Sequence, residues 1–260
     1  MSENMIFCYS GSGNCLDMAI KIARLLGDTD IVMMRRAPVV TDATAAKRVG
    51  FIFPCYGGGL PGGVEEYVRS IKINPASYVF AVEQYAAYKG CGLYVIDSIV
   101  NLDYWYGVSN HCSAIWLFPH YLTMPMTTLA EAQLRTDAAA LTVARSVQRM
   151  EKSAKKPPKN EAFRLESNMF GNINQKVNAA MTVNDDCIAC GLCERLCPRE
   201  NIKTESGKAV IGTNCIGCMA CVEYCPQEAI NVGKITVKRA RYHNANVSAG
   251  ELCEKIIHVD

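Results

Sequence analysis

Residues 185–202 read DDCIACGLCERLCPRENI, and residues 213–230 read TNCIGCMACVEYCPQEAI. The two stretches align position by position, so the C-terminal third of the chain contains an internal repeat. Each copy spaces its cysteines as C-x2-C-x2-C-x3-C and follows the last one with proline. Eight of the 14 cysteines thus stand in two arrays: Cys187, Cys190, Cys193 and Cys197, then Cys215, Cys218, Cys221 and Cys225.

This spacing is typical of cysteines that hold a [4Fe–4S] cluster through their thiolates. Two-residue gaps let one loop reach three corners of a cubane, and the fourth cysteine cannot turn back to the same cluster. Structural zinc and disulfides are the alternatives. Zinc sites pair C-x2-C units across a longer gap, and disulfide frameworks belong to short secreted chains. We therefore predict that the arrays bind two [4Fe–4S] clusters.

Over residues 181–233 the chain resembles the bacterial two-cluster ferredoxins, a small α+β fold. The resemblance implies crossed ligation, in which each array lends its last cysteine to the other cluster. One cluster would then be held by Cys187, Cys190, Cys193 and Cys225, and the other by Cys215, Cys218, Cys221 and Cys197. A module of this size cannot bury a large core, so the clusters should supply much of its folding free energy.

The N-terminal 151 residues alternate short apolar runs with helical stretches. Strands are expected at Met5–Tyr9, Ile31–Met34, Val49–Pro54, Tyr78–Val82 and Ser113–Phe118. Helices are expected at Asn14–Leu26, Gly63–Ser70, Gly92–Leu102 and Thr128–Glu151. Nearly continuous apolar strands that alternate with helices predict a doubly wound parallel sheet.

A turn rich in glycine and serine follows the first expected strand, at Ser10, Gly11, Ser12, Gly13, Asn14 and Cys15. Such a turn before a helix is an anion site, because backbone amides and the helix N-terminus point toward the ligand. It matches neither the Walker A sequence nor G-x-G-x-x-G. An ordinary strand-to-helix turn is the alternative.

The turn resembles the FMN phosphate loop of flavodoxins, although that family usually has threonine where Cys15 stands. The resemblance implies a five-stranded sheet of order 2-1-3-4-5 and two loops that frame the flavin ring. One loop contains Pro54, Cys55, Tyr56, Gly57 and Gly58, and the other contains Tyr85 and Tyr88. Cys55 would lie beside the flavin, and Tyr56 would stack on it.

Composition and charge narrow the class of protein. Half of the 260 residues are hydrophobic and the net charge is +2, which suits a globular protein and argues against nucleic acid or a membrane surface as the partner. No apolar run approaches the ~20 residues of a membrane span, and the N-terminus shows no signal peptide. We expect a cytoplasmic protein and, because exposed clusters are oxygen-sensitive, an anaerobic host.

Four segments are predicted: an FMN-binding domain at 1–151, a linker at 152–180, the cluster module at 181–233 and a tail at 234–260. The first part of the linker is basic and broken by prolines. It is expected to be solvated, with a docking site for an acidic redox partner as the alternative.

The whole chain resembles the flavodoxin–ferredoxin fusion family of anaerobic bacteria and archaea. The resemblance includes the tail segment Arg241-Tyr242-His243-Asn244. It implies an iron–sulfur flavoprotein that relays electrons between its clusters and FMN, to or from a ferredoxin-like donor or an acceptor enzyme. Two alternatives stay open: an FMN-dependent reductase of a small organic substrate, and a redox-sensing interaction protein. No acid–base constellation near the expected flavin is visible, which favours the relay.

Overall fold

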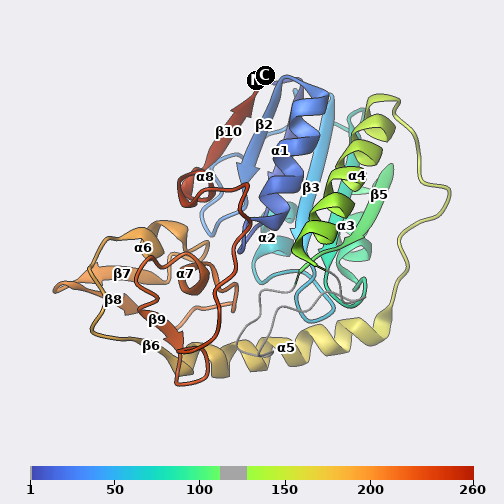
Figure 1. Ribbon diagram of the computed structural model, residues 1–260. Coiled ribbons are helices and arrows are strands. Elements are labelled where there is room, and N and C mark those ends of the chain that lie inside the picture. Colours follow the sequence, from blue (N-terminus) through green and yellow to red (C-terminus); the bar gives the residue numbers. More distant parts are fainter. Residues whose placement is uncertain (1, 112–127) are drawn as a thin grey trace.

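The larger domain is built on one six-stranded sheet (Figure 1). The structure is a computed structural model that describes residues 2–111 and 128–260. The strand order is β10-β2-β1-β3-β4-β5. The strands are β1 (Asn4–Cys8), β2 (Thr29–Met33), β3 (Arg48–Pro54), β4 (Tyr78–Tyr85), β5 (Tyr104–Ser109) and β10 (Ile256–Val259).

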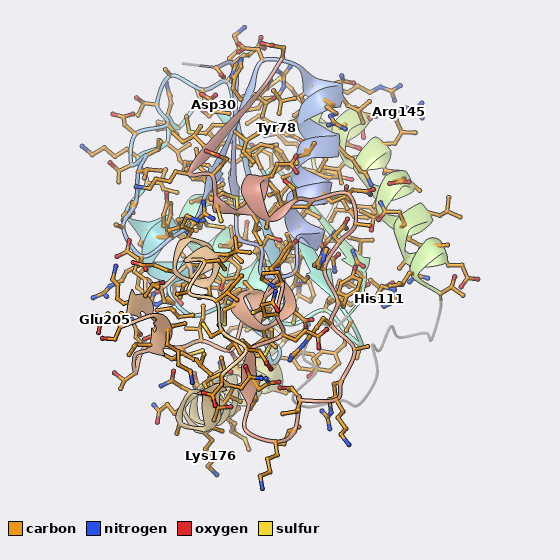
Figure 2. All side chains as sticks on the ribbon, turned by 60° about the vertical axis from the view of Figure 1, so that its left-hand side comes forward. Asp30, Tyr78, His111, Arg145, Lys176 and Glu205 are labelled. Carbon is orange, nitrogen blue, oxygen red and sulfur yellow. The ribbon has the colours of Figure 1, made fainter. Side chains whose placement is uncertain are left out.

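Strands β1 to β5 pair in parallel in the order 2-1-3-4-5, which is the flavodoxin-like arrangement. The predicted fold class is therefore confirmed. The sheet has six strands rather than five, because β10 from the C-terminal tail pairs antiparallel with β2. His258 of β10 lies 2.9 Å from the carboxylate of Asp30 on β2, the residue labelled in Figure 2.

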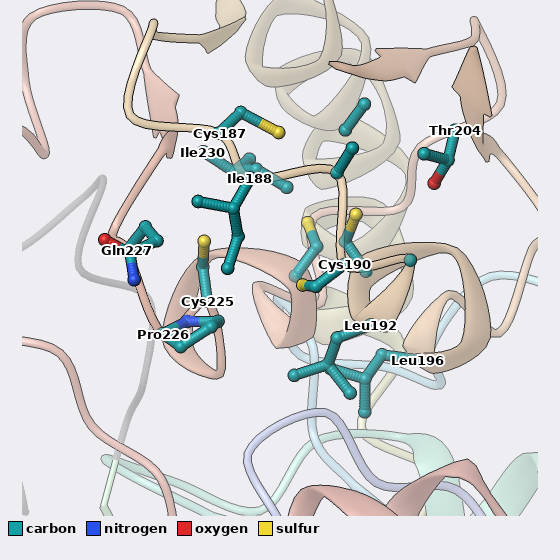
Figure 3. Close-up of a pocket in the computed structure, with 15 residues that line it drawn as sticks. Cys187, Ile188, Cys190, Leu192, Leu196, Thr204, Cys225, Pro226, Gln227 and Ile230 are labelled. Carbon is teal, nitrogen blue, oxygen red and sulfur yellow. The ribbon is translucent and has the colours of Figure 1, made fainter. Parts of the chain in front are cut away.

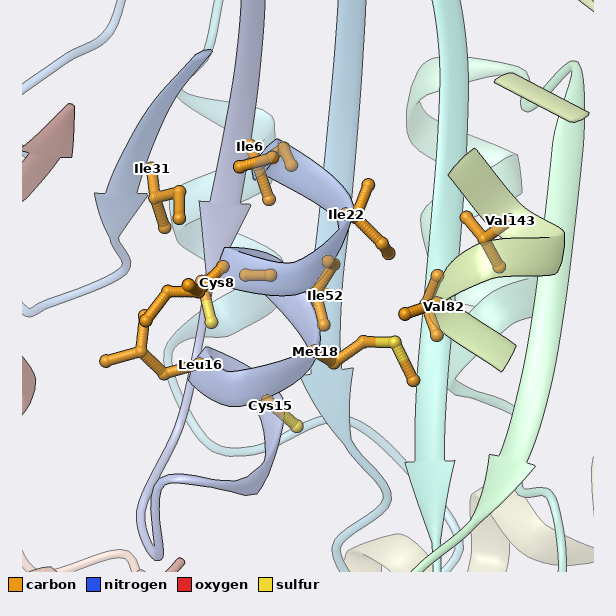
Figure 4. Close-up of a cluster of buried hydrophobic side chains, with 14 of the residues drawn as sticks. Ile6, Cys8, Cys15, Leu16, Met18, Ile22, Ile31, Ile52, Val82 and Val143 are labelled. Carbon is orange, nitrogen blue, oxygen red and sulfur yellow. The ribbon is translucent and has the colours of Figure 1, made fainter. Parts of the chain in front are cut away.

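Two pairs of helices cover the sheet. Helices α1 (Asn14–Leu26) and α4 (Leu129–Gln148) lie on one face, and α2 (Val64–Arg69) and α3 (Gly92–Val100) lie on the other. Successive side chains of β1 pack into the two helical layers in turn: Ile6 and Cys8 face α1 (Figure 4), whereas Met5 and Phe7 face α2 and α3. This double burial explains why the strands read as continuous apolar runs.

The fifth strand lies earlier than expected. It occupies Tyr104–Ser109 and pairs with Phe80–Tyr85, whereas the predicted run Ser113–Phe118 lies outside the described residues. The stretch YWYGVS is an edge strand whose side chains are mostly half-buried. A search for continuous apolar runs misses such a strand, because only one of its flanks is covered by a neighbour.

The cluster module forms a separate small domain with two antiparallel ribbons. In one, β6 (Met181–Val183) pairs with β9 (Ile230–Val232); in the other, β7 (Ile202–Glu205) pairs with β8 (Lys208–Ile211). Two short helices, α6 (Leu192–Leu196) and α7 (Ala220–Glu223), each follow the first cysteines of an array. The internal repeat of the sequence thus becomes two copies of a loop and a helix.

The segment predicted as a linker has a defined path. Lys152 pairs with Asp103 at 3.0 Å and Lys156 with Asp97 at 2.8 Å, so the basic stretch lies along the flavodoxin-like domain. Helix α5 (Glu161–Ala180) then runs beneath the carboxyl ends of the strands to the small domain (Figure 1). No helix in the described ranges is both long and apolar enough to cross a membrane.

The tail returns from the small domain to the large one. Helix α8 (Ala249–Cys253) packs against α6 of the small domain, and β10 completes the sheet. The small domain therefore lies in the sequence between helix α5 and strand β10, and both of its ends are anchored to the larger domain.

Candidate functional site

The eight array cysteines line two cavities in the small domain. Cys187, Cys190, Cys193 and Cys225 line one cavity (Figure 3). Cys215, Cys218 and Cys197 line the other. Cys221 lines both. The structure thus brings together the two crossed sets that the ferredoxin resemblance implies, with the last cysteine of each array beside the other array.

The surroundings of the sulfurs suit thiolate ligands. The backbone amides of Asn201, Gly217 and Ala229 each donate to a cysteine sulfur at 3.3 Å. Gly191 and Gly217 have positive φ, which lets the loops turn around a central group without a Cβ penalty. Amide donors to sulfur stabilise bound thiolates. The described residues contain no group of three His, Cys, Asp or Glu side chains placed to hold a single metal ion.

Burial and neighbouring cysteines keep the Cys193 and Cys218 thiols protonated in the absence of a metal. Burial, with smaller effects from the nearby Cys190, Cys225 and Cys187, raises the pKa of Cys193 to about 11. Burial raises the pKa of Cys218 to about 12, again with neighbouring cysteines adding to the effect. Binding a cluster would therefore release protons from these two thiols.

The two cavities differ in their access to solvent. Cys190 is exposed, and Ile188 beside it has 61% of its surface exposed. Cys221, by contrast, is buried and Cys218 is half-buried, and Ile216 and Cys218 pack against the core of the large domain. We call the Cys187 set the outer site and the Cys215 set the inner site.

The predicted phosphate loop lies at the carboxyl end of β1 and opens helix α1. The Ser10 hydroxyl is buried and has no hydrogen-bond partner among the described residues. The backbone amides of residues 10–13 also donate to no backbone carbonyl in the part of the chain that the structure describes. Unpaired donors at the start of a 13-residue helix fit a phosphate group. Cys15 is buried, and its thiol donates to Gln84 at 3.4 Å, which ties the loop to β4.

The two predicted ring loops lie together at the same edge of the sheet. The Cys55 amide donates to the Gln84 carbonyl at 2.7 Å, and the Cys91 amide donates to the Gly58 carbonyl at 2.7 Å. Tyr56 reaches the phosphate loop, since its hydroxyl would lie 2.9 Å from a Cβ on Gly11. Pro54 and Tyr85 end the two strands that carry these loops.

Helix α5 covers both ring loops. Phe163 stacks on Tyr88 with ring centroids 4.7 Å apart, and its backbone would lie 3.1 Å from a Cβ on Gly58. Farther along, Asn174 contacts Gly217 of the inner cysteine loop, and Val177 enters the core of the small domain. Lys176 points away from this contact into solvent (Figure 2). One helix therefore joins the predicted ring site to the inner site.

The inner cysteine loop packs directly on the phosphate loop. A Cβ on Gly11 would lie 2.5 Å from the Cys218 carbonyl oxygen, closer than any side chain tolerates. Tyr9, immediately before the phosphate loop, is 2% exposed and lies beside Cys218. The candidate flavin site and the inner cluster site thus share a wall.

Residues of the tail clamp the outer side of the phosphate loop. The Asn244 amide donates to the Ser12 carbonyl at 2.8 Å, and the Tyr242 hydroxyl donates to Asn14 Oδ1 at 2.7 Å. Tyr224, which precedes the ligand candidate Cys225, donates to the same Ser12 carbonyl at 3.3 Å. The tail segment noted in the sequence therefore holds the two domains together at this loop.

Comparison with known protein families identifies the small domain. Residues 186–230 match the family described as a 4Fe-4S dicluster domain. The chain joins a sheet of flavodoxin-like strand order to a 4Fe-4S dicluster domain. The strand order of the large domain establishes the flavodoxin-like half, and the family match establishes the iron–sulfur half.

Solved structures that match part of this chain include three flavoproteins and oxidoreductases. The rubredoxin oxygen:oxidoreductase of Desulfovibrio gigas is 14% identical, with a TM-score of 0.37, and the match covers 56% of this chain and 36% of that one. A flavoprotein of Lactobacillus acidophilus in complex with FMN is 12% identical, with a TM-score of 0.33 and coverage of 41% and 93%. An FMN-dependent NADH-azoreductase of Bacillus anthracis is 9% identical, with a TM-score of 0.37 and coverage of 56% and 99%.

The fusion thus spans about a third of the D. gigas protein. A comparison with curated proteins finds no match.

Sequence reasoning missed a buried carboxyl group near the ring loops. Glu83 lies on β4, is fully buried and neighbours the Cys55 thiol. Burial raises its pKa to about 7, although the Gly90 and Gly92 amides, Cys55 and Lys89 oppose the rise. Its signal in the sequence is a single acid in the otherwise apolar run YVFAVEQY.

Cysteine replacement tests the cluster sites. Cys190→Ala removes one ligand of the outer site, so we expect loss of about half of the iron and local unfolding of the small domain, because the clusters substitute for a core. Iron analysis and hydrogen exchange on anaerobic protein measure both effects. Cys253→Ala in α8, outside both sets, is the matched control. Full iron and native exchange protection in Cys190→Ala would contradict the ligand assignment.

The Glu83 carboxyl predicts a pH-dependent stability. Its pKa is higher in the folded chain, about 7, than its ordinary value of 4.5. The folded protein therefore retains a proton that the unfolded chain has lost, and the free energy of unfolding falls as pH rises between about 5 and 8. Glu83→Gln should weaken this dependence in denaturant titrations. Exposed Glu66→Gln serves as the control, and an unchanged slope in Glu83→Gln would refute the prediction.

Proposed function

We propose that this fusion carries electrons between two [4Fe–4S] clusters and FMN, and relays them to or from a redox partner protein. The observation that carries the proposal is the contact between the Cys218 loop and the phosphate loop at Gly11. It puts the inner cluster site against the candidate flavin site with no solvent layer between them.

The two cysteine sets form a path for electrons between the protein surface and the candidate flavin site. The exposed loop around Cys190 and Ile188 is where a partner would approach, because no other part of either cysteine set reaches solvent so openly. Cys221 lines both cavities and so connects the outer site with the inner one. Clusters exchange single electrons, whereas a flavin holds one or two, so the pairing matches one-electron with two-electron chemistry.

The residues at the phosphate loop would hold the FMN phosphate. Ser10 Oγ and the amides of residues 10–13 are unpaired donors in the described structure, and α1 adds the partial positive charge of its N-terminus. Lysine is absent from the loop, so neutral donors would carry the binding. A reducing, cytoplasmic compartment suits a protein with eight cluster thiolates.

The alternative of a small-molecule reductase draws support from one observation. Glu83, protonated near neutral pH and adjacent to Cys55, would provide a proton source close to the ring loops. Against it, α5 covers these loops with Phe163 stacked on Tyr88, which restricts access of a substrate to that side. The relay therefore remains the function that the geometry supports best.

Cofactor content tests the proposal most directly. Protein purified without oxygen should contain about eight irons and one FMN per chain, as two four-iron clusters and one flavin require. Iron analysis, flavin quantification and the visible spectrum provide the measurement. Iron without FMN would leave only the ferredoxin function, and colourless or zinc-containing protein would refute the proposal.

The phosphate loop has its own test. Ser10→Ala should weaken FMN binding by roughly tenfold, the value of one lost hydrogen bond to a charged group. Fluorescence quenching of FMN on titration with the flavin-free protein gives the dissociation constant. Ser98→Ala, which removes an exposed hydroxyl bonded to Val95 on α3, is the control. Equal affinity in Ser10→Ala and wild type would place the phosphate elsewhere.

A further inference from the structure

Tyr9 lies where the two domains meet, and none of its contacts in the described structure satisfies the hydrogen-bonding capacity of its hydroxyl group. The residue directly follows β1 and immediately precedes the phosphate loop. Its side chain is 2% exposed, yet its hydroxyl has no hydrogen-bond partner in the described structure. A buried hydroxyl without a partner has lost its hydrogen bonds to water and has gained no hydrogen bond within the protein, which is energetically unfavourable.

The neighbour of this hydroxyl is a cysteine of the inner site. Cys218 is half-buried and packs against the hydrophobic cluster that contains Tyr9, with its thiol beside the Tyr9 hydroxyl. As a protonated thiol, Cys218 is a poor acceptor. As a thiolate bound to iron it would be a strong one, so the cluster supplies the partner that the hydroxyl lacks.

The surroundings hold Tyr9 in this position. Its ring packs edge-on against Tyr56, with centroids 6.1 Å apart and planes at 88°. Its backbone amide donates to the Ile52 carbonyl at 2.9 Å, which anchors it to β3. The Cys218 carbonyl rests on Gly11 two residues later, so the distance between Tyr9 and the cysteine loop is set by backbone contact. The hydroxyl is therefore preorganised toward the sulfur.

We propose that the Tyr9 hydroxyl donates a hydrogen bond to the cluster-bound Cys218 sulfur and thereby raises the reduction potential of the inner cluster. Reduction adds one electron, and part of the added negative charge lies on the ligand sulfurs. A donor to sulfur stabilises the reduced form more than the oxidised form. Tyr9 is a positioning residue from the flavodoxin-like domain that tunes a centre in the ferredoxin domain. The inference rests on the proposed occupancy of the inner site.

The test is a potentiometric titration of the anaerobic holoprotein followed by electron paramagnetic resonance. Tyr9→Phe removes only the hydroxyl and should shift the reduction equilibrium of one cluster about tenfold toward the oxidised form, which is about 59 mV for one electron. The other cluster should keep its potential. Iron content, measured first, shows that both clusters are present.

Tyr78→Phe is the matched control. It removes the hydroxyl of another buried tyrosine of the flavodoxin-like domain, but that hydroxyl bonds the Glu151 carbonyl and lines neither cysteine site. Its cluster potentials should equal those of the wild type. A potential unchanged in Tyr9→Phe, a rise, or an equal shift of both clusters would overturn the inference while leaving the relay intact. A protein without an inner cluster would overturn both.

A second substitution keeps the hydroxyl and covers the case in which Tyr9→Phe fails to hold its clusters. Tyr9→3-fluorotyrosine preserves the ring and makes the hydroxyl a stronger donor, because fluorine lowers its pKa. The potential of the inner cluster should then rise, opposite to the effect of Tyr9→Phe. A merely structural role for the ring predicts no rise, and that result would overturn the inference.

Discussion

The contact of the Cys218 loop with the phosphate loop is the constraint on which the rest of the structure depends. At Gly11 the two backbones come so close that no side chain fits between them. This approach requires glycine on the flavodoxin-like side and a tight cysteine turn on the other. Helix α5 and the tail then fix the small domain from two directions, through Asn174 at Gly217 and through Asn244 at Ser12.

The fold was predictable from the sequence where local pattern and burial agree. Strands β1 to β4 are buried on both faces and read as apolar runs, and the repeated arrays define the small domain. The pattern failed where burial is one-sided. Strand β5 has half-covered aromatic residues, and β10 alternates exposed and half-buried residues in a tail that reads as polar. Its pairing with β2 is a contact between distant segments, which periodicity does not report.

For the candidate sites, too, the residues marked by a local motif were predictable, and those defined by distant contacts were not. The spacing of the cysteines predicted which residues gather, because chemistry and loop geometry are encoded within a few positions. The phosphate loop was recognisable for the same reason. The roles of Tyr9, Tyr224 and Glu83 come from neighbours that are far away in sequence, and no local motif marks them. Helix α5 was expected only as a linker, since its partners at Gly58 and Gly217 lie in two different domains.

Covalent linkage alone would raise the effective concentration of one redox domain near the other, but it would leave their orientation to diffusion. Here the small domain is anchored at both ends, and a tyrosine adjacent to the ligand candidate Cys225 bonds the loop that would hold the flavin phosphate. Assembly of the cysteine loops and shaping of the phosphate loop therefore involve the same residues. Disorder in the cysteine module would remove the contacts of Ser12 and Gly11, so the flavin site depends physically on the integrity of the iron–sulfur domain.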